Sequence, residues 1–200
     1  IGVCAMAGAG LEEVGNPSML FLSGNSEPTP GSAVFPAMEG TRPVLVEIQA
    51  LIVRLQSGAT PRRAVVGWDS GRLAMLLAVL EARCGLNFST AEVYLNVSGG
   101  YRLSDPAADL AVAAALVSAL SGQALPKGSV WFGEVSLGGE IRPVAHQALR
   151  RRESAKLGFD QAFGPEDASG AKGALRDESG LRYRELTMLP NLVDRIITSA

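Results

Sequence analysis

Residues 104–122 read SDPAADLAVAAALVSALSG. A polar cap at Ser104 or Asp105 precedes a proline suited to the first turn of a helix, and Gly122 ends the apolar run that follows. The many alanines would let this helix pack closely against its neighbours. From Asp105 to Val117, however, the helix contains no serine. The stretch therefore has the frame of an active site without a reactive group at its centre.

Composition sets the broad class of the protein. The chain has 200 residues, 47% of them hydrophobic, and a formal net charge of −2 at pH 7. It is long enough for one globular domain, or one domain with a small appendage. No apolar run approaches the roughly 20 residues that span a bilayer. The first ten residues also lack a basic signal-peptide region, so we expect a cytoplasmic protein without membrane contact.

Several kinds of chemistry are excluded by missing motifs. Cys4 and Cys84 form neither a disulfide framework nor a metal-ligand pattern, and His146 is the only histidine, so we expect no metal. No GxxxxGK[ST] motif is present, so this chain has no Walker-type ATP site. The near-neutral charge also argues against a protein that coats nucleic acid by bulk charge.

The pattern of apolar residues predicts a mixed α/β or α+β fold. Besides the helix already described, three helices are predicted. The first is capped by Ser70 and ends at Gly85, and the other two occupy 147–157 and 189–200. Residues 24–40 predict a loop leading into a strand, and residues 129–144 predict a hairpin about a Gly-Gly turn. The remaining strands are expected within 42–53, 62–68, 91–100 and 181–186. Since strands and helices alternate irregularly, we expect a mixed sheet.

Two of these segments carry a family resemblance. SDPAADLAVAAALVSALSG, followed by GEVSLGGEIRPV (133–144), resembles the proteolytic domain of the Lon protease family. The resemblance covers about 58–165 and implies the ribosomal-protein-domain-2-like topology of that domain. It places Ala107 in the slot of the nucleophilic serine and Ala148 in the slot of the catalytic lysine. Since both groups are missing, we expect no peptidase activity. Asp109 would add a carboxylate where a peptide substrate should lie.

A more extensive resemblance points to the C-terminal domain of the bacterial RadA (Sms) family of DNA repair ATPases. It is carried by residues 1–24, 61–80, 95–120 and 130–144. It implies a Lon-like domain over 23–200, and a segment over 1–22 that links from an absent RecA-like ATPase core. ATP, magnesium and zinc are then expected only in absent domains. We therefore expect no cofactor in this chain.

The same resemblance implies a role in DNA repair and in the branch migration of recombination intermediates. It also implies a homo-hexameric ring, RecA recombinase as a partner, and binding to single-stranded or branched DNA without sequence preference. The hairpin at 136–144 and the helix at 149–156 are our candidate ring contacts. Two alternatives remain open: an oligomerisation domain without DNA contact, and a Ser-Lys peptidase whose dyad has relocated to Lys127, Lys156 or Lys172.

Arginines supply the candidate DNA contacts. Arg54, Arg62 and Arg63 flank a predicted turn, and Arg72 lies in the first turn of the next helix. All four are expected on one edge of the sheet, where they would bind phosphates. The alternative is that they are solvated and pair with nearby acids. Lys127 and Arg42 are weaker candidates. The triplet 150–152 covers too wide an arc of a helix for one face, which favours a solvated helix or a subunit contact.

Overall fold

The computed structural model describes residues 27–40, 42–56, 60–167 and 180–198, and two short strands nearer the N-terminus. Its centre is a seven-stranded mixed sheet in the order β11-β10-β7-β3-β4-β6-β5. These strands are β3 (Ser32–Glu39), β4 (Arg42–Arg54), β5 (Arg63–Val66), β6 (Ala91–Val97), β7 (Ser129–Trp131), β10 (Gln161–Gly164) and β11 (Arg182–Glu185). The mixed α/β fold expected from the sequence is confirmed.

Antiparallel and parallel pairs divide the sheet. β4 pairs antiparallel with β3 on one side and with β6 on the other. β5 is parallel to β6, and β7, β10 and β11 form a parallel group. The two parts meet at a single pairing, Val34 with Val130. The strand β3 lies within 24–40, the segment predicted as a loop leading into a strand, where the Gly- and Pro-rich surroundings obscured its extent.

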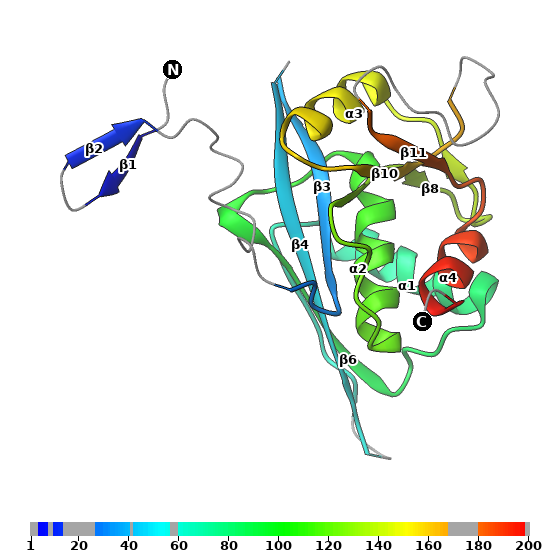
Figure 1. Ribbon diagram of the computed structural model, residues 1–200. Coiled ribbons are helices and arrows are strands. Elements are labelled where there is room, and N and C mark those ends of the chain that lie inside the picture. Colours follow the sequence, from blue (N-terminus) through cyan, green and yellow to red (C-terminus); the bar gives the residue numbers. More distant parts are fainter. Residues whose placement is uncertain are drawn as a thin grey trace.

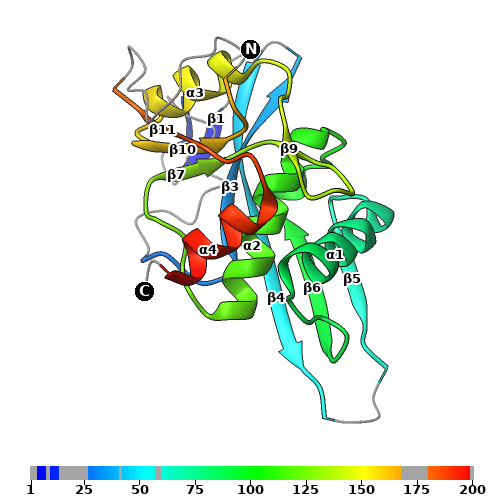
Figure 2. The ribbon, with the colours of Figure 1, turned by 90° about the vertical axis from the view of Figure 1, so that its right-hand side faces the viewer.

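Four helices complete the fold: α1 (Ser70–Cys84), α2 (Asp109–Ser121), α3 (Gln147–Lys156) and α4 (Leu189–Thr198). The helices α1, α2 and α4 cover one face of the sheet, and α3 packs against β3 and β4 (Figures 1 and 2). Asp69, rather than the predicted Ser70, caps α1 by accepting the Arg72 N–H at 2.7 Å. Gly85 ends this helix in the left-handed region, at φ 68°, as predicted.

The helix predicted at 104–122 begins with a 3-10 turn, η3 (Pro106–Ala108), before α2 itself. Every residue of α2 from Asp109 to Ser118 is buried. The small side chains explain this position, because they let the helix lie close to β3, β4 and α4 at the same time. The helix that opened the sequence analysis is thus the centre of the core. A second 3-10 turn, η2 (Ser98–Gly100), follows β6.

The predicted hairpin is shorter than expected. Only β8 (Glu134–Val135) and β9 (Ile141–Arg142) pair, whereas β7 belongs to the main sheet. Near the N-terminus, β1 (Cys4–Ala7) and β2 (Gly10–Glu13) form an antiparallel pair. Residues 164–180 are polar and rich in glycine, a composition that predicts a flexible excursion, and most of them lie outside the described residues. Among the helices that the structure describes, none is long and apolar enough to cross a membrane.

Candidate functional site

The start of α2 is closed at the position expected for a nucleophile. Asp105 caps the η3 turn by accepting the Ala107 N–H at 2.9 Å. The Ala107 side chain is fully buried. Its carbonyl accepts the Gly133 N–H at 2.8 Å, and Gly133 in turn accepts the Leu110 N–H at 3.0 Å. These bonds hold the residue before β8 against the helix start, so the slot of Ala107 is packed interior with no open face for a substrate.

Asp109 does not lie where a substrate would bind, contrary to the sequence expectation. Its side chain has no exposed surface and accepts hydrogen bonds from Arg72 Nε at 2.5 Å and Nη2 at 2.6 Å. The Val135 N–H donates to the same carboxylate at 2.9 Å. Burial raises the pKa of Asp109 above its usual value, although both donors act in the opposite direction. The carboxylate therefore joins α1, α2 and β8.

Arg72 is consequently a structural residue, with a side chain that is 27% exposed. Its hydrogen bond to Asp109 raises the pKa of the guanidinium, and Glu134 lies 3.8 Å from Nη2. The sequence pattern suggested nearby acids as its partners, but Asp109 lies 37 residues away in the chain. Arg72 lies in the first turn of α1, whereas Arg54 lines a hollow beside the end of that helix. The two ends are about 18 Å apart at a rise of 1.5 Å per residue. The expectation that it shares an edge with the other arginines is therefore wrong.

The lysine slot contains no base. Ala148 is exposed on the first turn of α3. The charged group that reaches the helix start is Arg150, whose side chain is 2% exposed and which donates to Asp105 at 2.5 Å. Arg150 also donates to the carbonyls of Ala145 and Pro36. Because a guanidinium stays protonated in proteins, Arg150 cannot accept a proton from a nucleophile.

The structure tests one of the two interpretations given for the arginine triplet of α3, the solvated helix. Arg150 is buried as described, and its guanidinium lies 5.4 Å from the centre of the Phe35 ring. Arg151 is also buried, pairing with Asp167 at 2.7 Å and lying 4.5 Å from the Tyr183 ring. Only Arg152 is largely exposed, at 61%. The solvated interpretation is therefore wrong for two of the three residues, because α3 packs against β3 and β4.

A relocated Ser-Lys dyad has little support in the described residues. A lysine base must be desolvated. Lys156 is 60% exposed and pairs with Glu153 at 2.7 Å, and Lys127 is exposed in a turn. Lys172 lies outside the described residues. No group of histidine, cysteine, aspartate or glutamate in the described part of the chain is arranged to hold a metal ion.

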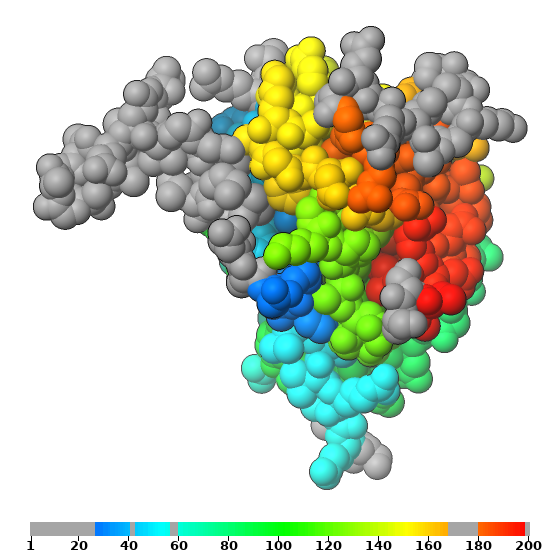
Figure 3. Space-filling model, in the orientation of Figure 1, coloured from blue at the N-terminus to red at the C-terminus, as the bar shows by residue number. Residues whose placement is uncertain are grey.

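Three candidate DNA contacts do lie together. Arg54, the last residue of β4, is opposite Ala91 of β6, and Arg63 of β5 is opposite Val93 on the other side of that strand. Arg62 immediately precedes β5. All three are exposed, and none forms an ion pair within the described ranges. This end of β4 extends from the body of the molecule (Figure 3), which makes a basic edge accessible from several sides.

The three arginines are not equivalent. Arg63 donates to the carbonyls of Phe88 and Ala91, so its guanidinium also ties the start of β6. Arg62 lies beside Tyr94, whose pKa is raised mainly by its hydrogen bond to Glu92 at 2.7 Å. Arg54 lines a small hollow at the ends of α1, α2 and α4.

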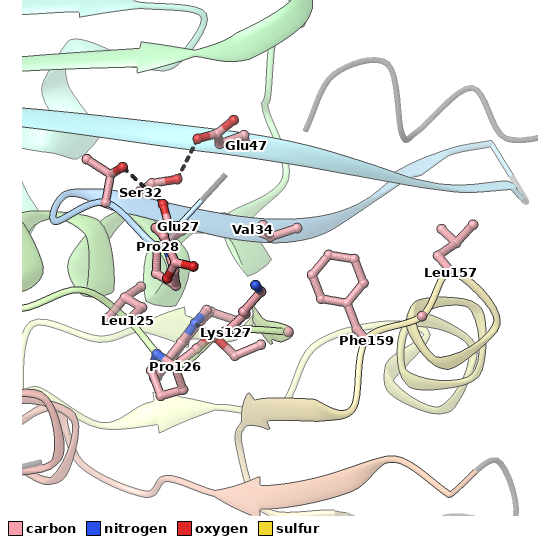
Figure 4. Close-up of a pocket in the computed structure, with 16 residues that line it drawn as sticks. Glu27, Pro28, Ser32, Val34, Glu47, Leu125, Pro126, Lys127, Leu157 and Phe159 are labelled. Carbon is pink, nitrogen blue, oxygen red and sulfur yellow. Dashed lines mark hydrogen bonds between the residues drawn. The ribbon is translucent and has the colours of Figure 1, made fainter. Parts of the chain in front are cut away.

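The two weaker candidates lie elsewhere. Arg42 begins β4, about 40 Å from Arg54 at 3.3 Å per residue; its side chain is outside the described residues. Lys127 lines a cavity of about 360 Å³ beside β3 (Figure 4). The basic edge is therefore defined as Arg54, Arg62 and Arg63.

Sequence comparison supplies related proteins. The chain is 57% identical over 199 residues to the DNA repair protein RadA of Brucella abortus, covering all of the chain and 42% of that protein. It is 53% identical over 161 residues to RadA of Rickettsia felis and 50% identical over 165 residues to RadA of Salmonella typhimurium, covering 36% of each. No family model matches the chain. The chain thus spans about two fifths or less of the length of these relatives.

Proposed function

Because the chain is homologous over its whole length to one domain of DNA repair protein RadA, we propose that it is a non-catalytic, Lon-like scaffold and DNA-binding module. It would belong to a RadA-type, DNA-dependent ATPase that acts in DNA repair and in the branch migration of recombination intermediates. Residues 23–200 would form the Lon-like unit, with a ribosomal-protein-domain-2-like topology, and 1–22 would link it to an ATPase core. ATP, magnesium and zinc would then bind outside this chain.

The observation that carries the non-catalytic part is the packed start of α2. Ala107 has no exposed surface, and the nearest buried cation, Arg150, is held by Asp105 and cannot serve as a base. A peptidase of this kind needs a nucleophile beside a desolvated amine. The fold therefore keeps the helix, the cap and the hairpin as a scaffold and supplies neither reactive group.

The DNA-binding part rests on the basic edge. Phosphate contacts by arginine supply most of the affinity of sequence-independent binding, and they require cations that are not already neutralised. Arg54, Arg62 and Arg63 meet this requirement at one projecting end of the sheet. The scaffold would support assembly of a hexameric ring, in which repetition of this edge would give several contacts to one DNA, with RecA recombinase as a partner of the complete protein.

The test is DNA affinity measured by fluorescence anisotropy across a salt series. We expect Arg54→Ala/Arg62→Ala to weaken binding at low salt and to reduce the slope of log K against log salt by about 1.4 to 1.8, since each phosphate contact contributes roughly 0.7 to 0.9. The matched control is Arg152→Ala/Arg182→Ala, which removes two exposed arginines elsewhere. Arg63 is left intact because its carbonyl contacts would make Arg63→Ala destabilising.

Equal salt slopes for both double variants and the unmodified chain would remove the basic edge from the proposal. A purely structural oligomerisation domain, with no DNA contact of its own, would then be the function that remains. Single-stranded and branched oligonucleotides are both used as probes, because backbone contacts at a projecting edge do not by themselves choose between them.

A further inference from the structure

The turn of the β8–β9 hairpin presents an unusual side chain. Leu137 is 66% exposed, more than any other large apolar side chain in the described part of the chain. Met188, also exposed, lies next to the hairpin because it forms an isolated bridge with Glu140. The tip of the hairpin is thus a small apolar knob on an otherwise polar turn.

The backbone that carries Leu137 is held in place. The Ser136 N–H donates to the Glu140 carbonyl at 3.0 Å, and the Gly139 N–H donates to the Ser136 carbonyl at 2.9 Å. The Gly139 carbonyl accepts the Leu189 N–H at 2.7 Å, which ties the turn to the start of α4. Because the turn is already ordered, binding through Leu137 would lose little conformational freedom.

A complementary cavity lies on another part of the surface. It has a volume of about 360 Å³, within the range of roughly 300 to 1,000 Å³ usual for ligand pockets. Figure 4 shows Phe159 and Lys127 facing β3 across this space. Its apolar wall is formed by Val34, Leu125, Pro126, Leu157 and Phe159.

The charges around the knob and the cavity are complementary. Lys127 and Glu27 line the cavity, and neither has an ion-pair partner in the described ranges. Glu140 and Arg142 flank the knob, each 58% exposed and 3.2 Å apart. If Leu137 of one copy entered the cavity of the next, Lys127 would offer Glu140 a partner of opposite charge, and Glu27 would offer one to Arg142.

The same charges disfavour nucleic acid as the occupant of the cavity. Glu47 also lines it, 5% exposed and bonded to the Ser32 hydroxyl at 2.5 Å. Two carboxylates, from Glu27 and Glu47, would repel a phosphate group. An apolar side chain flanked by one acid and one base fits the lining better.

We propose that Leu137 of one copy inserts into the cavity beside Phe159 of a second copy and joins the copies head to tail. None of the residues that line the cavity belongs to the β8–β9 hairpin, so the two surfaces are distinct. Contacts between different surfaces continue from copy to copy and give a ring when the rotation closes. The inference rests on the assembly role proposed above and identifies its contact.

The first test is sedimentation of the 200-residue chain over a concentration series. We expect Leu137→Asp to raise the dissociation constant at least 100-fold, as loss of a central anchor does. The control is Leu51→Asp, which places the same charge at another exposed leucine, 60% exposed, on β4. It should assemble like the unmodified chain. Equal effects of the two substitutions, or an unmodified chain that stays monomeric throughout, would overturn the proposal.

Mixing two variants tests the head-to-tail arrangement directly. Leu137→Asp retains an intact cavity, and Phe159→Asp retains an intact hairpin. In the mixture, the hairpin of the Phe159→Asp variant can bind the cavity of the Leu137→Asp variant, and no other contact is intact. The mixture should therefore form dimers and nothing larger. A mixture that stays monomeric or assembles fully would overturn the proposal, once circular dichroism shows both variants folded.

A charge exchange provides a second, conservative set of variants. Lys127→Glu and Glu140→Lys alter exposed side chains, so both should fold. Each substitution alone should weaken assembly several-fold, because it places two like charges at the contact. The double variant should restore assembly, because every contact then pairs a glutamate at 127 with a lysine at 140. Absence of restoration would contradict the predicted alignment. These readouts use variants that leave the basic edge intact, so they fail or succeed independently of the DNA assay.

Discussion

The ion pair between Arg72 and Asp109 gives the sharpest test of how the scaffold is held together. Arg72→Met removes the guanidinium and keeps a side chain of similar reach. Asp109 is then left with no exposed surface and, among its described donors, only the Val135 N–H. Breaking a buried pair in this way costs about 3 to 5 kcal/mol, because it leaves a charge without compensation.

Protonation of Asp109 limits that cost. Neutralising a carboxyl with an ordinary pKa of 3.8 costs about 1.4 kcal/mol for each pH unit above that value, hence about 4 kcal/mol at pH 7 and less than 2 kcal/mol at pH 5. Burial already raises the pKa of Asp109, and loss of Arg72 raises it further. A raised pKa means that the protonated group favours the folded state at low pH. This contribution is lost as the pH rises through the folded pKa.

The variant should therefore be destabilised by about 4 kcal/mol at pH 7 and by about half that or less at pH 5, measured by urea unfolding. The control is Arg182→Met, which breaks the exposed pair with Asp160 and should cost less than about 1 kcal/mol at either pH. Arg72→Met/Asp109→Leu should recover part of the loss by removing the buried charge. A cost below 1 kcal/mol at pH 7, or one that is equal at the two pH values, would refute the reasoning.

Three further predictions concern the core around α2 and α3. Arg150→Met should lower the free energy of unfolding by about 3 to 5 kcal/mol and Arg152→Met by less than about 0.5 kcal/mol, because only Arg150 is buried and paired; equal urea midpoints would contradict this. Ala107→Ser/Ala148→Lys should show no cleavage of fluorescent casein, since Ala107 is buried and Ala148 exposed; turnover above that of the unmodified chain would contradict it. His146→Gly should raise the melting temperature by about 2 to 4 °C, because His146 has φ 62° and relief of such strain contributes about 1 kcal/mol; an unchanged melting temperature would count against it.

Local signals in the sequence predicted much of the fold. The glycines that end α1 and α2 are both in the left-handed region, at φ 68° and 71°, where glycine is preferred. The strand β4 is long and largely apolar, so its residue pattern alone predicted a strand. In contrast, β10 has only four residues, QAFG, and β3 contains a proline within an otherwise apolar run. Such segments become strands because their neighbours pair with them, which a local pattern cannot indicate.

The site was less predictable, because its contacts join distant parts of the chain. Asp105 and Arg150 are 45 residues apart, and the sequence suggested a solvated helix for Arg150. The burial of that helix depends on how α3 lies against β3 and β4. One available signal was Asp109, an acidic residue inside an apolar helix, because a buried carboxylate needs a cationic partner.

The identity of the cation at the helix start explains why two substitutions should not create a peptidase. A lysine desolvated at this place could lose its proton and act as a base. Arg150 keeps its proton, and its planar group is fixed by Asp105 and by two backbone carbonyls. Asp105 in turn holds the N–H of Ala107. A reactive serine at 107 would therefore need the Arg150 network dismantled and the packed helix start opened, so the packing opposes this chemistry as strongly as the two alanines do.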